Sequence, residues 1–184
     1  MKQITYKTAM LMALASGSRA SELAHLDNGY KKEIPDGIVF QLVKHKKNAR
    51  SSEMPGQVFI GELIGKPVLC PCRAIKEYIR RTKHDRKKGE DPLFRAMNKK
   101  GKGIEPGTMS RWLTECIKMA GIDVKTGRSI GHSTRSMSTS TAKNKGVSTA
   151  QIMKAAGWKT DNMFERFYYI PEFTADFTRT VLNE

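Results

Sequence analysis

The sequence predicts a mainly helical α+β fold with a small antiparallel β-sheet or hairpin, in one domain that covers residues 1–184. Three observations support this class. Several stretches carry apolar residues at the spacing of an α-helix, and one stretch alternates apolar and polar residues as a strand does. A polar turn region then separates that strand from further short apolar segments, as in a hairpin. The length of 184 residues allows one domain with a substantial core.

The first helix is expected over residues 5–15, where TYKTAMLMALA is apolar nearly all round. Such a pattern is typical of a helix that is buried on most sides. Gly17 interrupts it, and ASEL after Arg19 can start a second, short helix. Arg19 is therefore expected at a junction between two helices.

A strand is predicted at residues 37–43, because Ile38, Phe40 and Leu42 alternate onto one face. The basic stretch at 44–56 ends in Pro-Gly and predicts the turn of a hairpin. The segments that follow supply two further short strand candidates, at residues 57–60 and 67–69.

Two amphipathic helices are predicted next. Pro71 suits the first turn of one helix, and the apolar residues beyond it have helical spacing. This helix leads into a basic stretch at 80–91 that is expected to be an exposed connection. Thr108 is the expected N-cap of the other helix, which Gly121 ends. Its apolar stripe is predicted to be core and consists of Met109, Trp112, Leu113, Cys116, Ile117 and Ala120.

Two helices are expected in the last third of the chain. One should begin near His132. Ser148 and Gln151 form the pattern of a capping box before a second helix, with Gly157 at its C-terminal end.

The composition points to nucleic acid as a partner. Lys and Arg number 33 against 18 Asp and Glu, and the resulting net charge of +15 attracts polyanions. Cys70, Cys72 and Cys116 are too few for a disulfide framework or a tetrahedral metal site, so reduced thiols are expected. The sequence has neither a signal peptide nor an apolar run long enough for a bilayer. An intracellular, soluble protein is expected, in the nucleus of a eukaryote or otherwise in the cytoplasm or nucleoid.

Four local motifs follow one another in a fixed order: ASGSRASEL around Arg19, a basic hairpin around Lys47, GHSTRS at 131–136 and AAGWKTDNMFERFYY at 155–169. Each motif alone is weak. Together they resemble the tyrosine recombinase (phage integrase) family, whose order is Arg, hairpin Lys, His-x-x-Arg, His or Trp, then Tyr. The resemblance covers residues 9–171, and the last two motifs look most like recombinases of eukaryotic mobile elements, the DIRS-like and Crypton-like groups.

The resemblance implies site-specific DNA recombination or integration, without metal or ATP, through a 3′-phosphotyrosyl intermediate on Tyr168. Tyr169 is the alternative nucleophile. By the same resemblance Arg19 and Arg135 clamp the phosphate, a role that suits the charged, forked guanidinium group. His132 shares a helical face with Arg135 and would bind the same phosphate.

Three further positions carry roles by resemblance. Trp158 stands where many family members have His, and its indole N–H can donate to a phosphate oxygen. Lys47 is the expected general acid for the leaving 5′-hydroxyl, with Lys46 as its rival in the same basic turn. Glu22 resembles the acidic residue that orients the first arginine, although it could equally form an ordinary helix ion pair with Arg19.

Two rival functions remain open. A type IB topoisomerase shares the nucleophile and the phosphate clamp. Its pattern at the second arginine is Lys-x-x-Arg, whereas this chain has His132 three residues before Arg135. A domesticated DNA-binding module would keep the fold without cleaving DNA. The expected partners are double-stranded DNA and further copies of the chain, as a tetramer on DNA. The N-terminal core-binding domain of the family is expected to be absent, since the chain starts close to the first catalytic helix.

Overall fold

The computed structural model describes residues 1–42, 56–86, 91–97, 101–122, 130–158, 160, 164–166 and 168–169, with the backbone alone at 130–133. The fold is mainly helical with one small antiparallel sheet, which confirms the predicted class. In chain order the elements are α1 (Lys2–Ser16), α2 (Ala20–Ala24), η1 (Asn28–Tyr30), β1 (Lys31–Ile34), β2 (Gly37–Gln41), β3 (Gln57–Gly61), α3 (Pro71–Arg81), η2 (Lys83–Asp85), α4 (Pro106–Met119), α5 (Ile130–Asn144) and α6 (Thr149–Ala156).

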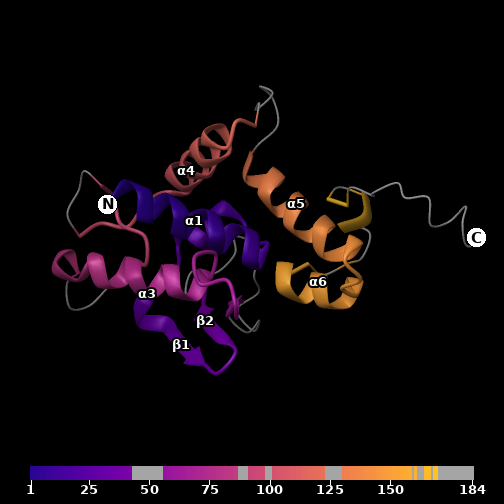
Figure 1. Cartoon of the computed structure of the whole chain (residues 1–184), viewed down its shortest axis with the longest axis horizontal. Coiled ribbons are helices and arrows are strands. Elements are labelled where there is room, and N and C mark those ends of the chain that lie inside the picture. Colours follow the sequence, from indigo (N-terminus) through magenta and orange to yellow (C-terminus); the bar gives the residue numbers. More distant parts are fainter. Residues whose placement is uncertain are drawn as a thin grey trace, which may run out of the picture.

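Helix α1 lies at the centre of the molecule and contacts α3, α4 and α5 (Figure 1). Ala9, Met12 and Ala13 are fully buried in it, as expected for a helix that is apolar nearly all round. Gly17 ends the helix in the left-handed region, at φ 59°, and its N–H donates to the Ala13 carbonyl. The chain then reverses, and Arg19 becomes the N-cap residue of α2.

The sheet has the strand order β1-β2-β3 with antiparallel pairs. Ile38 pairs with Ile60 and Phe40 with Val58, and all four are buried, because alternate residues of each strand face the helices. Strand β1 was not predicted. Its sequence KKEI is too polar to alternate clearly, since β1 is an edge strand.

The structure contradicts two local predictions. Residues 67–69 form a turn rather than a strand, closed by the Leu69 N–H donating to the Lys66 carbonyl, and Val68 is 69% exposed. Pro67 has no N–H to contribute to a sheet. Helix α4 has Glu105, not Thr108, as its N-cap residue, because a proline at position 106 fills the first helical turn with its fixed φ.

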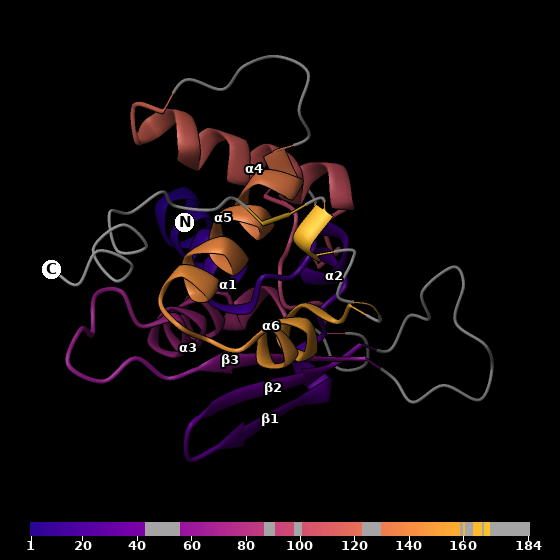
Figure 2. The same cartoon turned by 90° about the vertical axis from the view of Figure 1, so that its right-hand side faces the viewer.

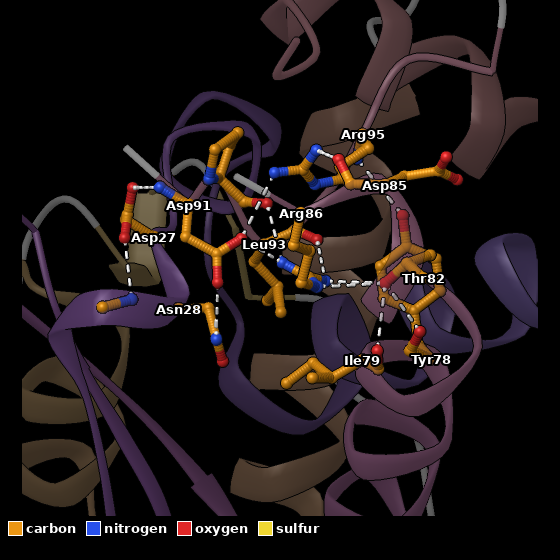
Figure 3. Close-up of polar contacts among 12 residues, drawn as sticks. Asp27, Asn28, Tyr78, Ile79, Thr82, Asp85, Arg86, Asp91, Leu93 and Arg95 are labelled. Carbon is orange, nitrogen blue, oxygen red and sulfur yellow. Dashed lines mark hydrogen bonds and ion pairs between the residues drawn. The ribbon is translucent and has the colours of Figure 1, made fainter. Parts of the chain in front are cut away.

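In the predicted connection at 80–91, Arg80, Arg81 and residues 83–85 are exposed as expected. The prediction is wrong for Thr82, which is buried, and polar contacts partly bury Arg86 and Asp91 (Figure 3). The Arg86 guanidinium donates to the Asp91 carboxylate at 2.6 Å and to the Thr82 hydroxyl. Asp91 also accepts from the Asn28 side chain, which ties the end of α3 to η1. Burial raises the pKa of Asp91, but the bonds from Asn28 and Arg86 outweigh it and the pKa is lowered.

A second, smaller core is formed by α6 and the residues that follow it, with α5 packed against it. Figure 2 shows α5 and α6 next to one another. Its buried members are Ile152, Ala156, Trp158, Phe164 and Tyr168. The predicted capping box of α6 is present, and Gly157 ends the helix at φ 64°. Cys70, Cys72 and Cys116 are free thiols, as predicted. Within the described ranges, none of the helices combines the length and apolar character needed to cross a bilayer.

Candidate functional site

Arg135 lies in α5 and is the largest fully buried side chain among the described residues. Its two terminal nitrogens donate to backbone carbonyls, Nη1 to Gly17 at 2.7 Å and Nη2 to Ala156 at 2.5 Å. Both carbonyls stand at the C-terminal ends of helices, where acceptors lack partners within the helix and attract cations. One guanidinium therefore joins the ends of α1 and α6.

Two aromatic rings pack against this guanidinium. The Arg135 Cζ atom lies 4.3 Å from the ring centre of Trp158 and 5.7 Å from that of Tyr168. The two rings contact one another with centres 4.8 Å apart. Burial and the nearby charge of Arg19 lower the pKa of Arg135 to about 10. The group is still a cation at neutral pH, in a region of low dielectric where its interaction with an anion is strong.

Glu22 links Arg135 to the second arginine. Its carboxylate accepts from the Arg19 backbone N–H at 2.8 Å and from Arg19 Nη1 at 2.9 Å. The same carboxylate lies 3.8 Å from Arg135 Nη1. The side chain of Arg19 is 36% exposed, so this second cation lies at the surface beside the buried one. Glu22 therefore contacts both arginines, and is more than an ordinary ion pair within one helix.

Two buried N–H groups in this cluster have no hydrogen-bond partner within the described part of the chain: Arg135 Nε and Trp158 Nε1. An unsatisfied buried donor costs about 1–3 kcal/mol. Such groups are rare in folded proteins, and they occur where a polar ligand completes the site. Arg135 and Trp158 therefore each keep one N–H that can donate to a further acceptor.

The two neighbouring tyrosines have different surroundings. Tyr168 is 9% exposed, and its ring lies in the cluster of Trp158 and Arg135. The ring of Tyr169 is half-buried against Phe164, with centres 5.5 Å apart. The backbone N–H groups of both tyrosines donate to the Phe164 carbonyl at 2.9 Å, so the difference lies in the side chains alone.

Comparison with known proteins identifies the family. The profile described as "Phage integrase family" matches residues 1–174. The chain belongs to the phage integrase family. No curated protein sequence matches it.

Several solved structures share the fold of this chain. XerA recombinase is 15% identical with a TM-score of 0.67, and the match covers 100% of this chain and 63% of XerA. XerH site-specific recombinase bound to difH substrate is 13% identical with a TM-score of 0.68, over 99% of this chain and 46% of XerH. The integrase of the Tn1549 transposon is 18% identical with a TM-score of 0.63, over 96% of this chain and 57% of that one. The chain thus spans about half to two thirds of these relatives.

The structure brings together most of the predicted site residues of this integrase. Arg19, Glu22, Arg135, Trp158 and Tyr168 form one connected group. Of the other four predicted residues, Tyr169 packs against Phe164 instead, and the side chains of His132, Lys46 and Lys47 lie outside the described residues. His132 belongs to α5, one turn before Arg135.

The groups that fix the cluster in place were not predicted from the sequence. These are the carbonyls of Gly17 and Ala156, and two serines of α5 that bond to Tyr168. A backbone carbonyl has no signature in sequence, although the glycine that ends each helix marks its position. Among the described residues, no three His, Cys, Asp or Glu side chains gather as they would around a metal ion.

Proposed function

We propose that this integrase cuts and rejoins double-stranded DNA at specific sites, with Tyr168 as nucleophile. The phenolic oxygen attacks the scissile phosphorus, a 3′-phosphotyrosyl bond forms, and the 5′-oxygen leaves as a hydroxyl once it takes up a proton. The bond to tyrosine conserves the energy of the diester, so rejoining needs no ATP. One observation carries the proposal: in a single chain, the ring of Tyr168 packs with a buried arginine and a buried indole.

The electrostatics of the cluster suit phosphate chemistry. Attack on a phosphodiester adds negative charge to the non-bridging oxygens, and donors that are already in place stabilise that charge without reorganising solvent. Arg135 Nε and Trp158 Nε1 are buried donors of this kind. Arg19 adds an exposed cation, which Glu22 orients. The same cations offset the negative charge that the transition state gathers around the phosphorus.

Proton handling is assigned to residues whose side chains are not described. His132, one turn before Arg135 in α5, would bind the phosphate and accept the proton of the phenol. Lys47 would donate a proton to the 5′-oxygen, with Lys46 as the alternative. A lysine suits this role because it is a mobile donor whose pKa responds to its surroundings.

The charge balance and the relatives support DNA and copies of the same chain as partners. The net charge of +15 favours a polyanion. The XerH structure contains its difH DNA substrate, and a lambda integrase structure is a tetramer bound to a Holliday junction. We infer that this chain also acts as an oligomer on DNA, as one catalytic domain of a tyrosine recombinase.

Covalent trapping tests the proposal. A duplex nicked close to the scissile phosphate loses a short strand after cleavage, so the adduct cannot religate. The chain should form a covalent adduct in excess EDTA, and Tyr168→Phe should form none. A requirement for Mg²⁺ would contradict the tyrosine mechanism. A domesticated binding module would bind the duplex without an adduct.

A second assay separates the remaining rival. A type IB topoisomerase relaxes supercoiled plasmid and does not exchange strands. The proposed recombinase should exchange strands between two matched sites. If the chain forms the adduct and relaxes the plasmid but does not exchange strands, the topoisomerase function is favoured.

A further inference from the structure

Two hydroxyl groups of α5 bind the backbone of Tyr168. Ser136 Oγ and Ser140 Oγ both donate to the Tyr168 carbonyl oxygen, at 2.5 and 2.9 Å. The serines are four residues apart, which places both hydroxyls on one face of the helix. A carbonyl oxygen has two lone pairs, so it can accept both bonds.

These bonds fix the tyrosine relative to the buried arginine. Arg135 directly precedes Ser136, so the guanidinium and the two hydroxyls belong to one helical segment. The Tyr168 N–H in turn donates to the Phe164 carbonyl at 2.9 Å. A helix is rigid over a single turn, and the distance between phenol and guanidinium is therefore set by α5 rather than by the longer connection after α6.

A third serine of α5 provides a contrast. Ser138 donates to the Leu14 carbonyl of α1 at 2.5 Å rather than to Tyr168. The hydroxyls of α5 thus have separate targets on opposite sides of the helix. Ser138 joins α5 to the main core, whereas Ser136 and Ser140 join it to the tyrosine.

We propose that Ser136 and Ser140 are positioning residues for the nucleophile. They hold the Tyr168 backbone so that its phenol stays beside Arg135. The assignment rests on the proposed function of Tyr168, and neither serine is given a role in binding DNA.

Chemical nitration tests the positioning without any need for catalysis. Tetranitromethane modifies exposed tyrosines, and Tyr30, which is 50% exposed, is an internal reference for Tyr168. The double variant Ser136→Ala/Ser140→Ala should raise nitration of Tyr168 several-fold relative to Tyr30. Ser138→Ala is the matched control and should leave the ratio unchanged. Alanine favours helix, so α5 should stay intact. Equal ratios in all three proteins would overturn the proposal.

Cleavage kinetics supply the second readout. At saturating nicked DNA, the double variant should form adduct about 100-fold more slowly, the cost of misplacing a reacting group by roughly 1 Å. The DNA concentration that gives half the maximal rate should not change. A variant that has one hydroxyl at these two positions, Ser136→Thr combined with Ser140→Ala, should recover most of the rate of adduct formation. An equal loss in Ser138→Ala would indicate general packing of α5 and refute the assignment.

The two readouts separate failure of the inference from failure of the proposed function. If the wild-type chain forms no adduct but its Tyr168 is protected from nitration, Tyr168 is not the nucleophile, although the two serines still hold it in place. Normal adduct formation by the double variant would keep the nucleophile and reject the positioning role.

Discussion

Replacing Trp158 by phenylalanine should separate the proposed catalytic role of the indole from its packing role. The indole ring stacks on Phe164, contacts Tyr168 and lies 4.3 Å from the guanidinium of Arg135. Its Nε1–H is buried and has no partner among the described residues. Phenylalanine keeps an aromatic ring at this position and removes only that donor and part of the apolar area.

The effect on stability should be small because two terms offset each other. The smaller ring loses about 1 kcal/mol of apolar burial at ~25 cal/mol per Å², and the weaker cation–π contact loses roughly 0.5 kcal/mol. Removing an unpartnered buried N–H returns about 1–3 kcal/mol. The free energy of unfolding should therefore change by no more than about 1.5 kcal/mol, equivalent to a Tm shift of a few degrees.

The effect on cleavage should be large if Nε1 donates to the scissile phosphate. Loss of one donor to a developing oxyanion slows reactions by about 100-fold or more, or roughly 3 kcal/mol. Adduct formation at saturating nicked DNA measures this rate, and thermal unfolding measures stability. The matched control is Trp112→Phe, since Trp112 is equally buried but belongs to the main core. This control should cleave at the normal rate.

Two results would refute the reasoning on Trp158. Cleavage within about threefold of the wild-type rate would show that the phosphate does not need Nε1. A large loss of stability in parallel with the loss of cleavage would show that the ring acts through packing. Trp158→His offers a further comparison, because imidazole can also donate and should retain part of the activity.

Tyr169→Phe should keep the covalent adduct that Tyr168→Phe loses, and peptide mapping that found the nucleotide on Tyr169 would reassign the nucleophile. Lys47→Ala should slow cleavage strongly. The variant should cleave at a normal rate when sulfur replaces the bridging 5′-oxygen of the substrate, because a thiolate leaves without a proton. If the sulfur substrate rescues Lys46→Ala instead, Lys46 is the general acid. Asp91→Asn should destabilise the fold by about 3 kcal/mol, since it leaves two largely buried arginines without their counter-ion. The pKa of Asp91 is lower in the folded protein than in the unfolded chain, where it is near 4. The Asp91 carboxylate therefore stabilises the fold above pH 4, and this stabilisation is lost as the pH falls through the folded pKa. Urea titrations at pH 7 and pH 3 should show a smaller difference in stability between variant and wild type at the lower pH.

The sequence alone predicted most of the helices and two of the three strands. Apolar residues at helical spacing predicted α1, α3, α4 and α6, and the capping box and Gly157 predicted the two ends of α6. These signals are local, since periodicity and capping depend on residues within a few positions of one another. At the start of α4 the predicted N-cap was off by three residues, because Pro106 fixes the first helical turn and makes Glu105 rather than Thr108 the N-cap residue.

The order of the motifs also carried the family assignment, which the match over residues 1–174 confirms. The narrower resemblance to recombinases of eukaryotic mobile elements stays a prediction. The charge balance indicated a polyanionic partner but gave no site. A sequence motif records which residue types are present, and the chemistry of those types then suggests roles.

Only the tertiary structure distinguished residues that the sequence treated alike. Arg19 and Arg135 were both expected to clamp a phosphate, but Arg135 is fully buried and joins two helix ends while Arg19 is partly exposed. Tyr168 and Tyr169 are adjacent, yet their rings pack against different partners. Arg135 bonds to a carbonyl 118 positions away, and Ser136 to one 32 positions away. Contacts of this kind depend on how whole helices pack, and packing is a property of the folded core that no local pattern in the sequence contains.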